Sequence, residues 1–159
     1  MTEQATTAAV RQSVTVPIDR ERAFRLFTEE IGSWWPSEGY KISEGPITEV
    51  FEARQGGRWY ELAEDGSQCT VGTILEWDPP SRFLMTWQLT PDWGLEDDLD
   101  RATKIEVVFE DADGGGTRVS LEHRGFEAYG ESGAKMRGQV GGEGGWSTLM
   151  NLYAERAGR

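Results

Sequence analysis

The chain has a single histidine, His123, the one side chain whose ordinary pKa suits proton transfer near neutral pH. His123 alternates with Val119 and Leu121, so we expect it on the apolar side of its strand, facing the interior. There it would either bond a ligand or move a proton, or it would be a structural residue bonded to a neighbouring element. The spacing sets no acidic or nucleophilic partner beside it, which favours the structural interpretation and predicts no catalytic residue.

Glutamates within the predicted strands are the next candidates, since two facing carboxyl groups can act as acid and base. Glu106 and Glu122 alternate with the apolar residues of their own strands, which predicts a solvated outer face for both. Glu61 shares the parity of Trp59, so it is the carboxylate expected to contribute to an internal pocket. No inward pair of carboxylates is predicted.

Aromatic residues are abundant enough to line a cavity as well as to fill a core, with 7 Trp, 6 Phe and 4 Tyr among 159 residues. Trp59, Trp87 and Trp146 fall on two predicted strands and on the last predicted helix, so all three can converge. They would form either an aromatic pocket or a completely packed core. The predicted ligand-binding set is Trp59, Glu61, Met85, Trp87, His123, Trp146 and Met150.

Metal and cofactor chemistry finds little support in the sequence. Cys69 is the single cysteine, which excludes an internal disulfide, and one histidine beside it cannot complete a Cys/His zinc cluster. The Gly-rich runs lack the residues of a phosphate-binding loop, and the run at 141–145 is interpreted as a hinge. The sequence therefore predicts neither a metal site nor a cofactor.

The charge balance limits the partners of the chain. The formal net charge is −12, and such a field repels phosphate backbones and anionic lipid surfaces. The N-terminus lacks the basic start and apolar stretch of a secretory signal, and no apolar run approaches the roughly 20 residues that span a bilayer. We therefore expect a cytoplasmic protein with no nucleic-acid partner and no membrane span.

Hydrophobic periodicity sets out the elements that must position these residues. A polar, disordered tail is expected over 1–9, followed by a single domain over 10–159. Apolar residues alternate at 11–17 and again in six later segments, which Gly, Pro and Asp turns separate. The later strands are predicted at 46–53, 57–63, 68–77, 82–90, 103–110 and 116–124.

Two helices are predicted, one near each end of the chain. Asp19 is the expected N-cap of the first, whose apolar residues continue at helical spacing as far as Ile31. The sequence Trp-Trp-Pro at 34–36 ends this pattern, and burial at the helix end is favoured over an exposed lid or a partner site. The second helix, at 145–157, presents one apolar stripe.

Two longer connections remain, an acidic rim loop at 91–102 and a Gly-rich loop at 127–144 that is expected to be mobile or functional. The order of strand, helix, six strands and helix predicts an α+β domain. In such a domain one curved antiparallel sheet covers its apolar face with the C-terminal helix.

Five separated motifs carry a family resemblance. They are V-x-V-P-I-D-x-x-x-A-F at 14–24, G-G-R-W at 56–59, P-P-S-R-F-L-M-T-W at 79–87, G-G-T-R-V-S-L-E-H-R-G-F at 115–126 and G-W-S-T-L at 145–149. In this order they resemble the START-like, or SRPBCC, superfamily. Within it they are similar to the proteins related to the C-terminal domain of the heat-shock-protein-90 ATPase activator.

The resemblance implies a helix-grip fold, in which a curved antiparallel sheet of about six to seven strands wraps around a long C-terminal helix. It also implies a hydrophobic cavity between the two, which different relatives use for lipids, polyketides, plant hormones or aromatic metabolites. No single activity follows from the resemblance.

The leading hypothesis is therefore a cofactor-free protein that binds a small hydrophobic or aromatic molecule between sheet and helix. One alternative is an enzyme like a polyketide cyclase or aromatase, in which the same pocket folds a reactive chain. Another is a chaperone-related interaction module, in which the acidic loop at 91–102 and exposed aromatic residues bind a basic protein surface.

Overall fold

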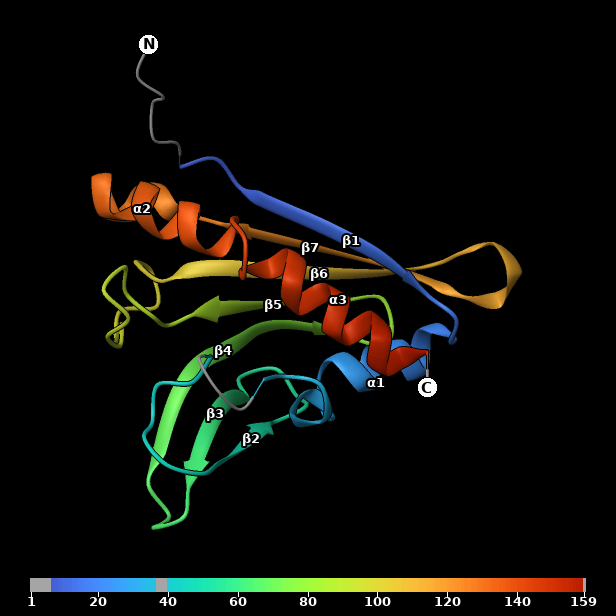
Figure 1. The fold of residues 1–159 in the computed structure, drawn as a ribbon, viewed down its shortest axis with the longest axis horizontal. Helices are drawn as coiled ribbons and strands as arrows, with labels where there is room; N and C mark the ends of the chain where they lie inside the picture. Colours follow the sequence, from blue (N-terminus) through green and yellow to red (C-terminus); the bar gives the residue numbers. More distant parts are fainter. Residues whose placement is uncertain (1–6, 37–39, 159) are drawn as a thin grey trace.

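The structure is a computed structural model that describes residues 7–36 and 40–158. Its described residues form a seven-stranded antiparallel sheet in the order β1-β7-β6-β5-β4-β3-β2 (Figure 1). The strands are β1 (Val10–Val16), β2 (Ile47–Phe51), β3 (Arg58–Ala63), β4 (Gln68–Asp78), β5 (Arg82–Trp87), β6 (Thr103–Asp111) and β7 (Thr117–Arg124).

The path of the chain makes β1 and β2 the two edges of the sheet. After β1 the chain passes through α1 (Arg20–Phe27) to the opposite edge, and β2 to β7 return as a meander to pair with β1. In that last pairing Val10 lies opposite His123. Short turns join the strands of this meander, as the turn residues predict, except for the longer connection 88–102 between β5 and β6.

The first helix is shorter than predicted. Asp19 caps it as expected, because its side chain accepts a hydrogen bond from the Arg22 backbone N–H at 2.8 Å. The helix ends at Phe27, where the Thr28 hydroxyl donates to the Phe24 carbonyl at 2.8 Å and the Thr28 backbone leaves helical geometry. Ile31 begins a separate 3₁₀ turn, Ile31–Ser33, labelled η1.

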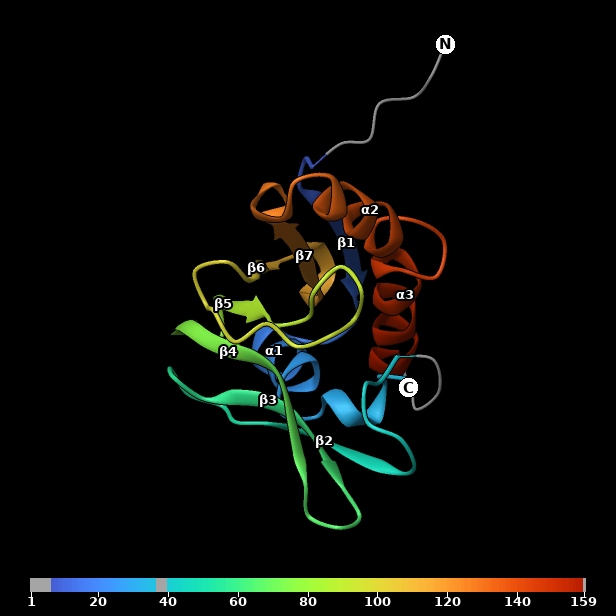
Figure 2. The same ribbon diagram turned by 90° about the vertical axis from the view of Figure 1, so that its left-hand side faces the viewer.

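The C-terminal helix α3 (Trp146–Ala157) runs beside the curved sheet, on the side that also holds α1 (Figure 2). The Tyr153 hydroxyl ties the two helices together by donating to the Ala23 carbonyl at 2.8 Å. The Phe27 ring also packs edge-on against the Tyr153 ring, with centroids 5.0 Å apart. This end of the interior is closed by aromatic packing.

The sheet curves where its pairing slips. The register shifts between Trp59 and Tyr60 in the β3–β4 pair, and again between Ile74 and Glu76 in the β4–β5 pair. Such bulges bend a sheet and increase its twist. Gly72 lies opposite Trp59 at the first shift, so the bend falls where the indole projects inward.

The segment at 127–144, which we predicted as a loop, is largely helical, and that prediction is wrong. It contains part of a 3₁₀ turn η3 (Phe126–Tyr129) and a helix α2 (Glu131–Val140). The buried face of α2 consists of Gly133, Met136 and Val140, so few apolar residues mark it in the sequence. Gly133 fits directly over the Phe126 carbonyl, which leaves no room for a side chain.

The remaining boundaries agree closely with expectation, apart from β5, which ends at Trp87 instead of residue 90. The first six residues of the predicted tail lie outside the described residues. Among the helices that the structure describes, none has the length and apolar composition needed to cross a bilayer.

Candidate functional site

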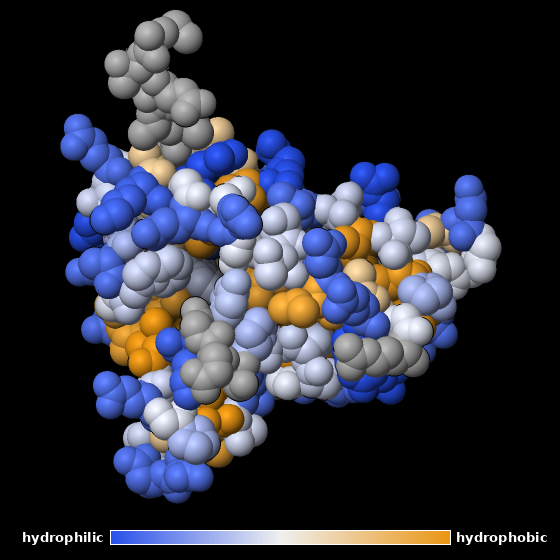
Figure 3. Space-filling view, viewed as in Figure 1, coloured by the Kyte–Doolittle hydropathy of each residue, from blue (hydrophilic) through white to orange (hydrophobic). Residues whose placement is uncertain are grey.

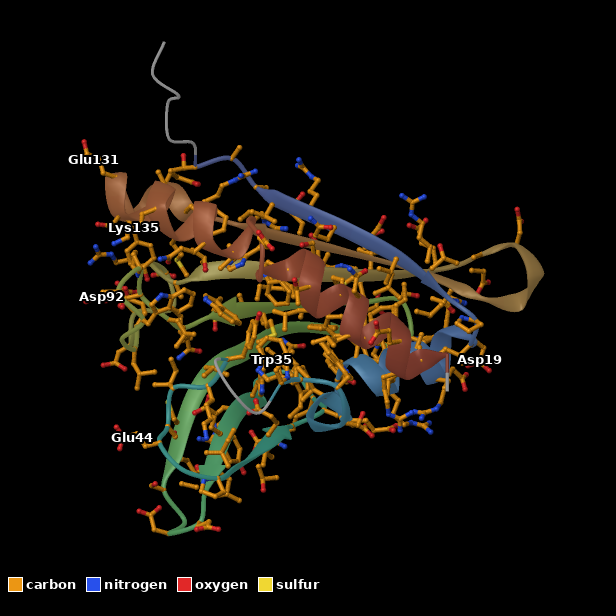
Figure 4. The ribbon with its side chains drawn as sticks, in the orientation of Figure 1. Asp19, Trp35, Glu44, Asp92, Glu131 and Lys135 are labelled. Atoms are coloured by element: carbon orange, nitrogen blue, oxygen red, sulfur yellow. The ribbon has the colours of Figure 1, made fainter. Side chains whose placement is uncertain are left out.

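A cavity of about 380 Å³ lies between the N-terminal part of α3 and the strands β2 to β5. Its volume falls in the range of small-molecule sites. Trp35, labelled in Figure 4, lies between α3 and this half of the sheet. The apolar part of the lining is Trp35, Ile42, Trp59, Val71, Trp87, Leu89, Trp93, Val140, Trp146 and Leu149.

Four tryptophans in this lining form a closed circuit of ring contacts, which we call the tryptophan circuit. Centroids are 4.8 Å apart for Trp35 and Trp59, and 6.0 Å apart for Trp59 and Trp87. Trp87 and Trp146 are 5.7 Å apart, and Trp146 returns to Trp35 at 6.1 Å. The contacts are tilted or edge-to-face, which is the geometry that aromatic quadrupoles favour, so the walls are mutually braced.

Hydrogen bonds fix three of these four indoles. Trp35 Nε1 donates to the Tyr40 carbonyl at 3.0 Å, and Trp59 Nε1 donates to Glu49 Oε1 at 2.8 Å. Trp146 Nε1 donates to His123 Nδ1 at 2.9 Å. Trp87 Nε1 is buried and has no partner among the described residues.

Glu49 is a functional candidate that sequence reasoning missed. It lines the cavity from β2, directly opposite Glu61 on β3. Burial raises the pKa of Glu49 to about 7, the Trp59 hydrogen bond opposes this shift, and the charge of Glu61 adds to it. Glu49 lies two residues before Phe51, which is buried on the same strand, so the alternation of side chains could have placed Glu49 on the inner face.

This pairing overturns the prediction that no two carboxyl groups face inward together. Glu49 and Glu61 are cross-strand neighbours, and both line the cavity. Glu61 is only 2% exposed, and its two oxygens accept the backbone N–H groups of Ile42 at 2.8 Å and Ser43 at 2.7 Å. Glu61 therefore holds the segment before β2 against the cavity, whereas Glu49 Oε2 is left without a partner among the described residues.

His123 lies behind the wall and does not line the cavity. An indole N–H can only donate, so His123 Nδ1 must accept from Trp146, which places the ring proton on Nε2. That proton donates to Thr103 Oγ1 at 2.7 Å. Burial lowers the pKa of His123 to about 3, so the ring is neutral near pH 7 and orients Trp146.

Some of the other predicted site residues line the cavity, and some, like His123, lie outside its lining. Trp59, Glu61, Trp87 and Trp146 line the cavity, as predicted for a pocket, whereas Met85 and Met150 are buried outside its lining. The Met85 methyl group instead covers Gly72 at the bend of β4. Trp34 and Trp35 are both buried, as favoured for the Trp-Trp-Pro motif, but only Trp35 reaches the cavity.

The connection between β5 and β6, residues 88–102, borders the cavity at one end. Trp93 lines the cavity although it is 40% exposed, and it adopts a positive φ of 65°. Leu95 and Leu99 are also exposed on this connection. Figure 3 shows hydrophobic surface over this end of the molecule, within a largely hydrophilic face. The predicted acidic rim loop thus carries apolar side chains beside the cavity.

The sequence matches the family model described as Activator of Hsp90 ATPase homolog 1-like protein over residues 17–154. The chain belongs to this family. The family resemblance drawn from the five motifs and the helix-grip fold are both confirmed. No curated protein matches the sequence.

Two solved relatives of this Hsp90 ATPase activator-like chain share substantial sequence with it. The anthrahydroquino-gamma-pyrone synthase Txn09, solved as a complex with SUM, is 36% identical, with a TM-score of 0.63 over 92% of this chain and 95% of that one. The self-sacrificing resistance protein CalC from Micromonospora echinospora is 33% identical, with a TM-score of 0.66 over 95% and 94%. MLL2253 from Mesorhizobium loti, at 17% identity and a TM-score of 0.65 over 93% and 95%, shares the fold.

The geometry restricts what this member of the activator-like family can do chemically. Among the residues that the structure describes, no group of three or more His, Cys, Asp or Glu side chains could hold a metal ion. Cys69 is partly buried, and its thiol pKa is raised by burial and by the charge of Glu61, so it is a poor nucleophile. What remains for a ligand within the described residues is apolar enclosure, the unpaired indole N–H of Trp87 and the carboxyl group of Glu49, whose pKa is about 7.

Proposed function

We propose that this chain binds a flat aromatic small molecule in the cavity between α3 and β2 to β5. The tryptophan circuit carries the proposal, because its four braced indoles enclose an apolar space whose shape is set before a ligand arrives. A preformed apolar pocket gains affinity from burial without ordering its own walls. The relatives named above support it, since one was solved with a bound compound and the other is a resistance protein.

Calorimetric titration with xanthone, a flat tricyclic ketone, tests this function. We expect saturable one-to-one binding to the wild-type chain and none to Leu149→Trp, since Leu149 lines the cavity and a larger ring fills it. Asn151→Trp is the matched control, because Asn151 is exposed on the same helix and the same ring is added outside. Equal binding by Leu149→Trp and the wild type contradicts the proposed site.

A second candidate is catalysis of ring closure in a substrate held by the same walls. The carboxyl group of Glu49 favours it, because a pKa of about 7 suits a group that both takes and returns a proton near neutral pH. The relation to Txn09, described as a pyrone synthase, adds support. Glu49 would then act on the substrate as general base and acid, with burial first and the charge of Glu61 second keeping its pKa raised.

The catalytic candidate has a direct assay. The compound 1-(2-hydroxyphenyl)butane-1,3-dione closes to 2-methylchromone with loss of water, and the change in ultraviolet absorbance reports the rate. If the chain is a catalyst of this class, the rate exceeds the buffer rate at pH 7 and falls by about 100-fold or more in Glu49→Gln. A rate equal to buffer leaves binding as the function. The chaperone interaction described by the family name stays a prediction for this chain.

A further inference from the structure

The buried polar groups that line the cavity are almost all paired within the described part of the chain. The two Glu61 oxygens accept backbone N–H groups, and the Tyr40 hydroxyl donates to the Gly144 carbonyl at 2.6 Å. Trp35 and Trp146 donate to a carbonyl and to an imidazole nitrogen. These groups shape the wall and have little hydrogen-bonding capacity left for a ligand.

Two atoms depart from this pattern. Glu49 Oε2 and Trp87 Nε1 are the two buried side-chain nitrogen or oxygen atoms without a hydrogen-bond partner within the described part of the chain. Both belong to residues that line this one cavity. Folded proteins pair nearly all buried polar atoms, and leaving one unpaired is costly, so the coincidence of both at one cavity requires an explanation.

Both residues neighbour Trp59, whose strand β3 lies between theirs in the sheet order. Glu49 bonds the Trp59 indole N–H at 2.8 Å, and the Trp87 ring lies 6.0 Å from the Trp59 ring between centroids. A flat ligand lying against Trp59 therefore lies between the strand that carries Glu49 and the strand that carries Trp87.

The chemistry of the two atoms specifies their partners. An indole N–H only donates, so Trp87 requires an acceptor such as a ketone oxygen. The carboxyl group of Glu49 already accepts from Trp59 through Oε1, and Oε2 is free to accept when ionised or to donate when protonated. A hydroxyl group satisfies both states, because it can donate to a carboxylate and accept from a carboxylic acid.

We propose that the cavity selects a flat aromatic ketone that also carries a hydroxyl group, with Trp87 Nε1 donating to the ketone oxygen and the Glu49 carboxyl group bonded to the hydroxyl. This proposal rests on the proposed function. It adds the class of ligand and the two residues that recognise it. The tryptophan circuit supplies apolar burial for any aromatic ring. Trp87 and Glu49 supply the discrimination between rings of similar size.

Three matched probes separate these contributions: xanthene, xanthone and the set of monohydroxyxanthone isomers. Xanthene has neither the ketone nor the hydroxyl, xanthone adds the ketone, and the isomers add a hydroxyl at each ring position. For the wild-type chain we expect xanthone to bind about 3- to 10-fold more tightly than xanthene, which corresponds to one net hydrogen bond. We expect at least one hydroxyl isomer to gain a further factor of the same size.

Two variants assign each gain to its residue. Trp87→Phe keeps an aromatic ring but removes the N–H, so the preference for xanthone over xanthene should vanish, whatever affinity both ligands lose together with the smaller ring. Glu49→Leu removes the carboxyl group, so the gain from the hydroxyl should vanish while the gain from the ketone remains. Xanthene binding is the internal control, since a misfolded variant loses all three ligands, and Glu49→Gln then serves as the milder replacement.

The binding results separate the roles of Trp87 and Glu49 from the proposed binding of aromatic rings. If xanthene binds the wild type as tightly as xanthone and every hydroxyl isomer, the cavity binds aromatic rings but the assignment of Trp87 and Glu49 is overturned. If Trp87→Phe keeps the full preference for xanthone, the role of Trp87 is overturned. If the wild type binds none of the probes, both the proposed function and this inference fail.

Discussion

At the scale of single residues, burial disfavours the charged form of the two perturbed groups nearest the tryptophan circuit, and their pKa values shift in opposite directions. Glu49 takes up a proton that it would lose in water, because its pKa is raised to about 7. His123 loses a proton that it would hold in mild acid, because its pKa is lowered to about 3. Glu49 lies in the cavity lining, and His123 fixes Trp146 from behind the wall.

Replacing Glu49 should change how stability depends on pH. The folded pKa of Glu49 lies above its unfolded value of 4.5, so its favourable contribution is complete below pH 4.5 and is lost as pH rises through about 7. We expect Glu49→Gln to gain stability on the order of 2 kcal/mol relative to wild type between pH 4.5 and pH 8, after allowance for screening of a half-buried group. Urea unfolding at a series of pH values measures the difference.

The matched control is Glu44→Gln, at the exposed position that Figure 4 labels in the segment before β2. This control should follow the wild-type pH profile throughout. Parallel profiles for the wild type and Glu49→Gln would show that Glu49 is not buried as the structure places it.

Replacing His123 should change the opposite side of the pH profile. Its folded pKa of about 3 lies below its unfolded value of 6.5, so its contribution is present above pH 6.5 and is lost as pH falls toward 3. Protonation would also set an N–H on Nδ1 against the Trp146 N–H. The wild type should lose about 2 kcal/mol more than His123→Gln between pH 6.5 and pH 5, as measured by chemical unfolding. Equal losses would argue against a buried neutral ring.

At the scale of elements, the strands could be predicted because alternating apolar and polar residues indicate a strand with one buried face. The helix α2 could not, because its buried positions include Gly133 and only a sparse apolar face. The cavity was predictable only in part. Trp59, Trp87 and Trp146 followed from their places on two strands and the last helix, and Glu61 followed from its parity with Trp59. The register that sets Glu49 against Glu61 is decided by strand pairing, which no single strand reveals.

The bend that opens the cavity depends on a strand glycine. A Cβ atom at Gly72 would lie 2.2 Å from Met85 Cε and 2.6 Å from the Thr86 carbonyl oxygen. We expect Gly72→Ala to cost about 2 kcal/mol or more in the free energy of unfolding, because overpacking against backbone cannot relax cheaply. The control is Gly138→Ala in α2, where a Cβ atom meets nothing within 4 Å. This variant should raise the free energy of unfolding by about 0.5–1 kcal/mol, because alanine favours a helix more than glycine does. Thermal and urea unfolding of the two variants should therefore shift in opposite directions.

At the scale of the whole molecule, the net charge of −12 acts on every ligand that approaches. The field adds to the local effect of Glu49 and Glu61 in the lining, and Lys41 is the cation among the lining residues. A neutral aromatic compound is unaffected by this field, whereas an anion must work against it. The charge that the composition displays therefore has a functional consequence at the cavity, beyond disfavouring nucleic acid.

A charged probe and its neutral counterpart test this consequence. We expect xanthone-2-carboxylate to bind about 10-fold more weakly than its methyl ester in 10 mM salt, because burial against two carboxyl groups and a negative surface disfavours the anion. The deficit should shrink in 150 mM salt, where the screening length falls from about 30 Å to about 8 Å. The ester has nearly the same shape, so the ratio of the two dissociation constants isolates charge from fit. A carboxylate that binds as tightly as the ester at low salt would mean that Lys41, rather than the net charge, governs what the cavity admits.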